Sequence, residues 1–171
     1  MEKSNRDLLK DKPRGKNESI LNKDFLLGIG FEGLLIAIFT MVAFYIGNPK
    51  ETPLTASTMA FATLCLARLF HGFNCRGKGS IFKLGVFSNK YVWYAFGVGL
   101  VLLNAVLFVP FLQNLFEVEN LAFNQYVSIY VLAFIPTLII QLKKVIFEFI
   151  ENKKSKNNAN INRSGELTDI A

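Results

Sequence analysis

Residues 58–76 read TMAFATLCLARLFHGFNCR, an apolar run that is interrupted by a single arginine, Arg68. His71 and Asn74 follow Arg68 within the next two turns of a helix. An apolar helix of about 20 residues is long enough to cross a hydrocarbon core of roughly 30 Å. A guanidinium inside such a helix is costly, so its position needs an explanation. The stretch therefore predicts a membrane helix that carries polar groups with a role of their own.

The rest of the chain predicts an all-α membrane protein with four transmembrane helices. Of its 171 residues, 51% are hydrophobic and 17 are Phe, which is too apolar for an ordinary soluble domain. We place the spans at residues 25–47, 55–74, 91–111 and 126–147. The predicted organisation is a cytoplasmic arm (1–24), a four-helix transmembrane domain (25–147) and a polar, disordered cytoplasmic tail (148–171).

Nearly all of the 19 Lys and Arg residues lie on one side of these spans. Lys50 is the only one between the first two spans, and residues 112–125 contain none. The positive-inside rule then places both termini in the cytoplasm. The net charge of +6 is a signal of topology, because the basic residues flank membrane segments and do not alternate with stacking aromatics. No nucleic-acid partner is expected.

Two interpretations of Arg68 are open. Its long stem could let the charge reach the lipid head groups, since Arg68 is about 9 Å from the inner end of its helix. It could instead face the interior of a helix bundle, where a charge marks an ion pathway or an internal counter-charge. The second interpretation is favoured because Arg68 shares a helix face with mostly small side chains, namely Thr58, Phe61, Cys65, Gly72 and Cys75.

Glu32 is a second charge within a span, one turn inside the first. It could mark the interfacial boundary or take part in transport, and the nearby Gly28, Gly30 and Gly33 would permit close helix packing. His71 and Asn74 favour hydrogen bonding at a helix end over metal ligation. Pro136 is expected to kink the fourth helix. Thr137 and Gln141 could serve contacts between helices.

The sequence contains no signature of catalysis. It has no phosphate-cradling glycine loop, no nucleophile elbow and no metal-ligand cluster. Cys65 and Cys75 are ten residues apart on one predicted helix, about 15 Å, which a disulfide cannot bridge. We therefore expect no catalytic, cofactor-binding or metal-binding residue, and no chemistry from this chain alone.

Several motifs occur in the order found in P-type calcium-transporting ATPases. TMAF with the later LF and NCR, then SIFKLGVFSNKYVW and VLFVPFLQNLFEVENL, resemble the eighth helix, the next cytoplasmic loop and the ninth helix of these pumps. LLKDKPRGKNESIL resembles the loop that enters the seventh helix, and Pro136 falls where the tenth helix also has a proline. The resemblance covers about residues 5–150.

This resemblance implies the carboxy-terminal third or less of a ten-helix pump, without the phosphorylated Asp-Lys-Thr-Gly motif, the nucleotide and actuator domains or helices four to six. The parent pump would use ATP and magnesium to move calcium, and the partners of this piece would be membrane lipid and the remaining pump. In the two-calcium members of the family the eighth helix supplies a Glu to the first ion site, and Arg68 stands at that position. The resemblance then implies that Arg68 replaces the first calcium as a counter-charge.

Two alternatives remain open from the sequence. The chain could be an independent four-helix membrane protein that regulates or assembles with a partner. The stretch QLKKVIFEFIENKK could also be a calmodulin target or an autoinhibitory contact. Richness in Lys, Asn, Ile and Phe suggests an AT-rich bacterial genome, and hence a multi-pass protein of a bacterial plasma membrane.

Overall fold

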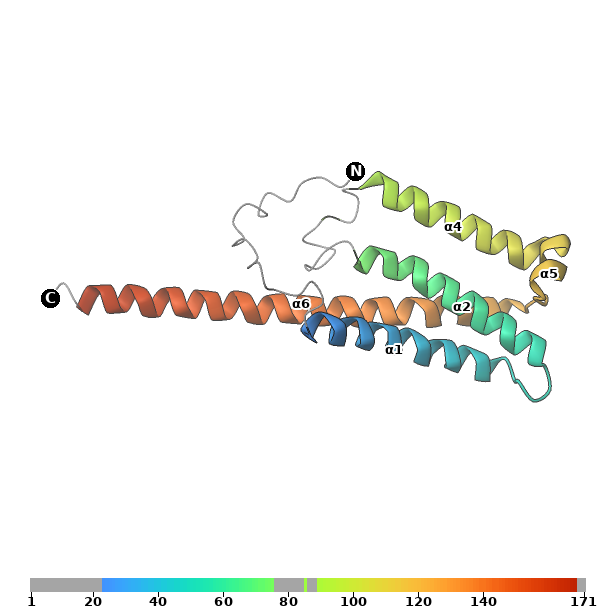
Figure 1. The fold of residues 1–171 in the computed structure, drawn as a ribbon, viewed down its shortest axis with the longest axis horizontal. Coiled ribbons are helices and arrows are strands. Elements are labelled where there is room, and N and C mark those ends of the chain that lie inside the picture. Colours follow the sequence, from blue (N-terminus) through green and yellow to red (C-terminus); the bar gives the residue numbers. More distant parts are fainter. Residues whose placement is uncertain (1–22, 76–84, 86–88, 169–171) are drawn as a thin grey trace.

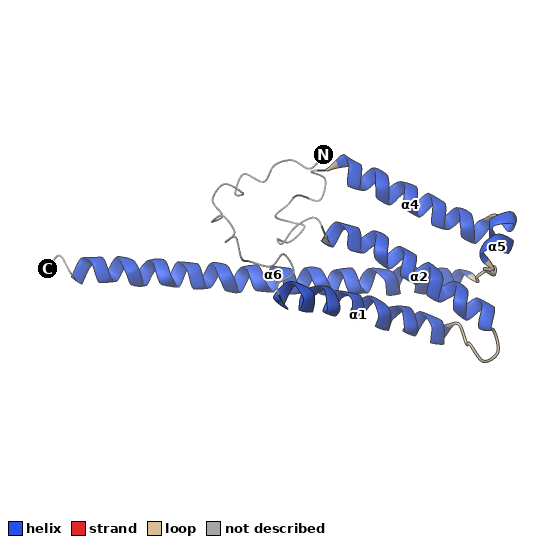
Figure 2. Ribbon diagram, in the orientation of Figure 1, coloured by secondary structure: helices blue, strands red, loops and turns tan. Residues whose placement is uncertain are grey.

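The computed structural model describes residues 23–75, 85 and 89–168, and within these residues all regular structure is helical (Figure 2). The elements are α1 (Lys23–Ile46), α2 (Pro53–Asn74), α4 (Lys90–Phe108), α5 (Pro110–Phe116) and α6 (Phe123–Thr168). Four of them, α1, α2, α4 and α6, are long and apolar enough to cross a membrane. The predicted arm, except for its last two residues, and most of the loop between α2 and α4 lie outside the described residues.

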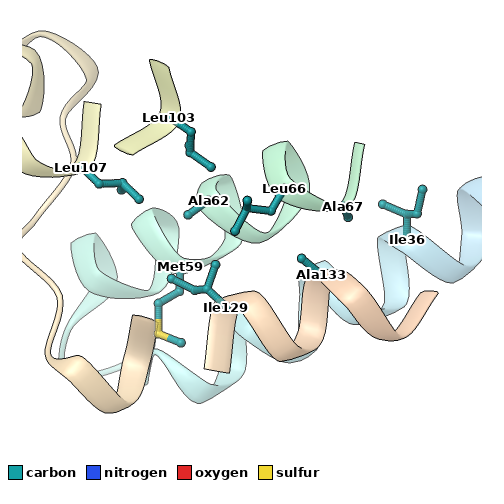
Figure 3. Close-up of a cluster of buried hydrophobic side chains, with 9 residues drawn as sticks. All are labelled: Ile36, Met59, Ala62, Leu66, Ala67, Leu103, Leu107, Ile129 and Ala133. Atoms are coloured by element: carbon teal, nitrogen blue, oxygen red, sulfur yellow. The ribbon is translucent and has the colours of Figure 1, made fainter. Parts of the chain in front are cut away.

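α2 is the central helix of the bundle. It packs against α1, α4 and α6, while α5 forms a short cap at the far end of α4 (Figure 1). Each helix turns one stripe of its surface inward, and the stripes meet in one buried cluster (Figure 3). Its members come from all four long helices: Ile36, Met59, Ala62, Leu66, Ala67, Leu103, Leu107, Ile129 and Ala133. Because lipid is as apolar as these side chains, close packing between small residues holds such helices together.

The turn between α1 and α2 forces their ends into backbone contact. Gly47 is buried, and a Cβ atom added to it would lie 2.4 Å from Cα of Ala56. Asn48 adopts a left-handed conformation with φ 54°, which Asn tolerates. Thr52 Oγ1 then donates to the Gly47 carbonyl at 2.7 Å and closes the turn.

The third span is shorter than predicted. α4 ends at Phe108 and a separate helix, α5, starts at Pro110, whereas the prediction continued the span to residue 111. Val109 between them has extended torsions, φ −87° and ψ 117°. A residue before proline is driven out of the helical region by the proline ring, which is why the helix stops there. α1, α2 and the apolar part of α6, Phe123–Ile150, begin and end within about three residues of the other three predicted spans.

α6 is longer than predicted. It continues as one helix through Pro136 and on to Thr168, which differs from the disordered tail expected for residues 148–171. Residues 137–164 contain neither Gly nor Pro. A helix that is already nucleated within the bundle adds residues at little cost, so the polar tail can continue it. The composition of the tail alone does not show whether the helix continues through it.

The glycines provide a matched test of the packing. Gly47→Ala should destabilise the bundle by about 1–3 kcal/mol, because the added methyl group meets backbone atoms that cannot move aside easily. Gly28→Ala is the control: a Cβ atom there has no neighbour within 4 Å, so the change should be neutral or slightly stabilising. Thermal unfolding of the two variants in detergent measures the difference. Equal unfolding temperatures would contradict the close approach at Gly47.

Candidate functional site

A cluster of polar side chains lies where α2 ends. It joins Glu32 of α1, His71 and Asn74 of α2, and Gln141 and Lys144 of α6. Four of the five, all except Lys144, were identified in the sequence as separate polar residues on three spans, and the structure brings them together. The cluster therefore links the three helices that form the densest part of the bundle.

Glu32 and His71 connect α1 to α2. Glu32 Oε2 lies 3.4 Å from His71 Nε2, and each side chain is about one-fifth exposed, at 22% and 20%. The contact is an ion pair when the imidazole is protonated. It could not be predicted from the sequence, because the two residues are 39 positions apart. Hydrogen bonding was predicted for His71. In the structure its partner is an acidic residue on the neighbouring helix, Glu32.

Asn74 connects α2 to α6. Only 2% of the Asn74 side chain is exposed, and its Oδ1 accepts a hydrogen bond from Gln141 Nε2. The Asn74 backbone carbonyl accepts a second bond from Lys144 Nζ at 2.5 Å. This carbonyl is one of the last in α2, where a cation complements the negative end of the helix dipole. The contact between helices that the sequence predicted for Gln141 is confirmed.

The contact of Lys144 with the end of α2 was not predicted from the sequence. Lys144 counted only as one of the basic residues that indicate the membrane topology. Its spacing from Gln141, three positions on one helix, could have indicated a shared face. Pro136 and Thr137 are also buried in α6, one turn further into the bundle. Among the described residues, four buried polar atoms have no hydrogen-bond partner: Thr63 Oγ1, His71 Nδ1, Asn74 Nδ2 and Thr137 Oγ1.

Arg68 lies one turn before His71 and points away from the bundle core. Its side chain is exposed, although its neighbours Leu66 and Ala67 are buried. In the part of the chain that the structure describes, no carboxylate is within ion-pair distance of Arg68. The exposed residues of α2 form one stripe with it, at the helical spacing Ser57, Leu64, Arg68, Gly72 and Cys75. Of the predicted face, Thr58 is buried, and Phe61 and Cys65 are half-buried.

The close helix packing predicted for three glycines is not seen among the described residues. Cβ atoms added to Gly28, Gly30 and Gly33 would meet nothing within 4 Å, so these three positions contact no other described element closely. The buried hydrophobic residues of α1 are Ile36 and Ala43.

A second polar contact, at the opposite end of the bundle, was also missed. Thr55 Oγ1 donates to Glu119 Oε2 at 2.6 Å, and Glu119 N donates to Thr58 Oγ1 at 3.0 Å. These bonds attach the loop after α5 to the first turn of α2. Both ends of α2 are thus fixed by hydrogen bonds to segments that are distant in sequence.

The described residues contain no group of three or more His, Cys, Asp or Glu side chains that could hold a metal ion. The two polar contacts connect helices of a multi-pass α-helical membrane protein, and Arg68 is exposed on the surface of α2.

Sequence comparisons give the family. Residues 1–146 match the family described as "Cation transporting ATPase, C-terminus", and the chain belongs to this family. The chain is 31% identical over 159 residues to calcium-transporting ATPase 1 of Bacillus cereus, covering 81% of this chain and 18% of that protein. It is 32% identical over 143 residues to the calcium-transporting ATPase of Bacillus subtilis, covering 82% and 16%.

A mammalian relative matches the same region. The rat calcium-transporting ATPase type 2C member 2 is 31% identical over 159 residues, covering 91% of this chain and 17% of that protein. The chain thus spans less than a fifth of the length of these relatives. The resemblance seen in the sequence is confirmed as C-terminal membrane-region homology, and the alternative of an independent four-helix protein is not favoured.

Asn74→Ala tests the cluster. The change removes the Asn74 Oδ1 acceptor of a buried hydrogen bond from the Gln141 amide, so we expect a loss of about 1–3 kcal/mol of stability. Glu32→Gln should cost less, about 1 kcal/mol at most, because both members of its pair are partly exposed. Asn114→Ala, at an exposed position of α5, is the control. Thermal unfolding in detergent ranks the stabilities of the three variants. Equal unfolding temperatures would show that the cluster does not stabilise the bundle.

Proposed function

We propose that this chain is the carboxy-terminal membrane part of an ATP-driven calcium pump. Its four helices would support the ion-transport helices, which the rest of the pump contributes. In this proposal calcium is the cargo of the whole pump, and ATP and magnesium act on its cytoplasmic domains. The partners of the described helices are lipid and the remaining pump. Family membership and the names of the relatives support this assignment.

The exposed guanidinium of Arg68 carries the proposal. An Arg side chain near the middle of a lipid-facing helix costs about 2.5–3.5 kcal/mol on insertion scales. Arg68 stands six residues from the end of α2, on a stripe that no other described helix covers. Covering this stripe with protein that supplies acidic groups removes the cost. The exposure of Arg68 thus supports an interface with further pump helices.

Arg68 would also set the number of ions that the pump carries. A fixed positive charge about 5 Å from a divalent cation is repelled by about 7 kcal/mol at an effective dielectric of 20. Arginine cannot lose its proton to relieve this repulsion. The guanidinium would therefore occupy the space of the first calcium, pair with acidic groups of the missing helices and leave a pump for one calcium ion.

Arg68→Glu in the full-length pump tests this role. Restoring a carboxylate should raise bound calcium from about one toward two ions per phosphorylated enzyme, and should change the pH dependence of transport because the new group can titrate. Radioactive calcium binding and transport in vesicles measure both. Lys50→Glu makes the same charge change at an exposed position in the turn after α1 and should alter neither. Unchanged stoichiometry and pH dependence in Arg68→Glu would count against the counter-charge role.

We also propose that both chain ends, and the end of α2 with them, face the cytoplasm. Cys75 follows α2 directly and is exposed, whereas Cys65 is half-buried within the span. Desolvation, with a smaller contribution from the Glu32 carboxylate, raises the pKa of the Cys75 thiol. Less of the reactive thiolate is therefore present than for an ordinary cysteine, so labelling with a thiol-selective reagent needs a longer reaction time.

A membrane-impermeant maleimide should label Cys75 in inverted vesicles and leave it unlabelled in sealed right-side-out vesicles. Cys75→Ser should abolish the signal, which excludes a contribution from Cys65. Labelling of Cys75 in right-side-out vesicles would reverse the proposed topology. Mass spectrometry of the labelled chain gives the readout.

A further inference from the structure

The apolar part of α6 is too long for the membrane that the other helices fit. It runs from Phe123 to Ile150, 28 residues, whereas the other three candidate spans have 19 to 22 residues. At 1.5 Å per residue this is about 42 Å, against a hydrocarbon core of roughly 30 Å. Burying all of it by tilting would need an angle of about 45°, beyond the usual range for membrane helices. One end of this apolar segment must therefore leave the hydrocarbon.

The polar cluster identifies which end of the apolar part of α6 leaves the hydrocarbon core. Lys144 Nζ bonds to the backbone carbonyl of Asn74, the last residue of α2, so Lys144 lies at the level where α2 ends. Figure 1 shows that α6 continues past the ends of the other described helices α1, α2 and α4. Residues 145–150 follow Lys144 and extend about 9 Å further along the helix axis. This distance corresponds to the boundary between head groups and acyl chains.

The segment 145–150 carries an apolar collar that covers more than half of the helix circumference, interrupted by Glu148. Its exposed members are Val145, Ile146, Phe147, Phe149 and Ile150, and the exposed fractions of the two phenylalanines are 68% and 73%. At 100° per residue these five side chains cover an arc of about 200°, and Lys144 and Glu148 occupy the remaining side of the helix. The stripe that a helix buries against its neighbours is typically about 100° wide, so one partner helix would leave much of this arc uncovered, whereas the interfacial layer of a membrane can cover all of it. The distribution of the collar thus favours lipid as its occupant.

Charge selects the kind of lipid. Residues 143–156 contain five Lys and two Glu, a net charge of +3, and Lys143 and Lys153 at the two sides of the collar are exposed. Basic residues next to a membrane helix attract anionic head groups, each by about 1 kcal/mol or about fivefold. Lys143 Nζ also lies 4.3 Å from the centre of the Phe31 ring, so its charge is held near the bundle surface.

We infer that residues 143–156 of α6 form a binding site for anionic phospholipid head groups, with the collar in the interfacial layer and the exposed Lys143 and Lys153 on its two sides. The inference rests on the proposed membrane insertion of the bundle but not on its orientation. It adds a lipid contact at a place that is remote from Arg68, and so is independent of the number of ions carried.

Quenching of one tryptophan reporter tests the site. Trp93 is the only Trp, so Trp93→Phe with Phe149→Trp places a single reporter in the collar. The full chain is reconstituted into symmetric vesicles that contain phosphatidylcholine and phosphatidylglycerol, one or the other brominated near the head-group end of its chains. Brominated phosphatidylglycerol should quench the reporter at least about twofold more strongly than brominated phosphatidylcholine. Lys153→Gln, Lys154→Gln and Lys156→Gln together, or 1 M salt, should remove this preference.

The control reporter is Trp93→Phe with Phe111→Trp, at an exposed position of α5 at the opposite end of the bundle. It should be quenched equally by the two lipids. Equal quenching of the collar reporter by both lipids would overturn the anionic site. Quenching by neither lipid would place the collar outside the membrane and would overturn it as well. Because the vesicles are symmetric, a reversed topology cannot imitate either result.

Discussion

The hydrogen bonds that Gln141 and Lys144 make to Asn74 fix the position of α6 relative to α2. Asn74 is almost fully buried, and a buried amide or carbonyl group that lacks a partner is expensive in an apolar surrounding. Sliding α6 by one turn would break both bonds, so the register between the two helices is defined by this contact. This register sets the level of Arg68 relative to α6, and how far the collar of α6 extends beyond the end of α2.

The helices α1, α4 and α6 cover part of the surface of α2, and no described helix covers another part of it. Small residues allow the helices to approach closely, as at Gly47 and Ala56. Aromatic rings fill the space where α4 diverges from α2, and the ring centroids of Phe73 and Trp93 are 5.1 Å apart. The stripe of α2 that carries Arg68 has no cover among the described helices. A charge on an uncovered stripe of a membrane helix is what a part of a larger assembly shows at its interface. Membership of the cation-transporting ATPase family supplies the assembly to which this interface would belong.

Polar groups in this protein gather at the two ends of α2, and each set joins segments distant in sequence. Glu119 holds the loop after α5 at one end, and Asn74 receives α6 at the other. Between the two sets most buried side chains are apolar, although Thr63 of α2 is buried as well. α2 is therefore held near both ends by hydrogen bonds, and Arg68 lies between these ends on the exposed side of the helix.

Length and apolar composition determined the four membrane helices, and motif order determined the family, because both depend only on local sequence. Pro110 was a sufficient signal for the early end of α4, although the prediction continued past it. The continuation of α6 to Thr168 was not readable, since a polar tail can be a helix or a coil depending on what precedes it. Glu32, His71 and Asn74 were recognisable as polar residues within apolar runs. Only packing could decide that Glu32 pairs with His71, that Lys144 meets Asn74, and that Arg68 faces outward, because these depend on the rotation and register of helices that the sequence leaves free.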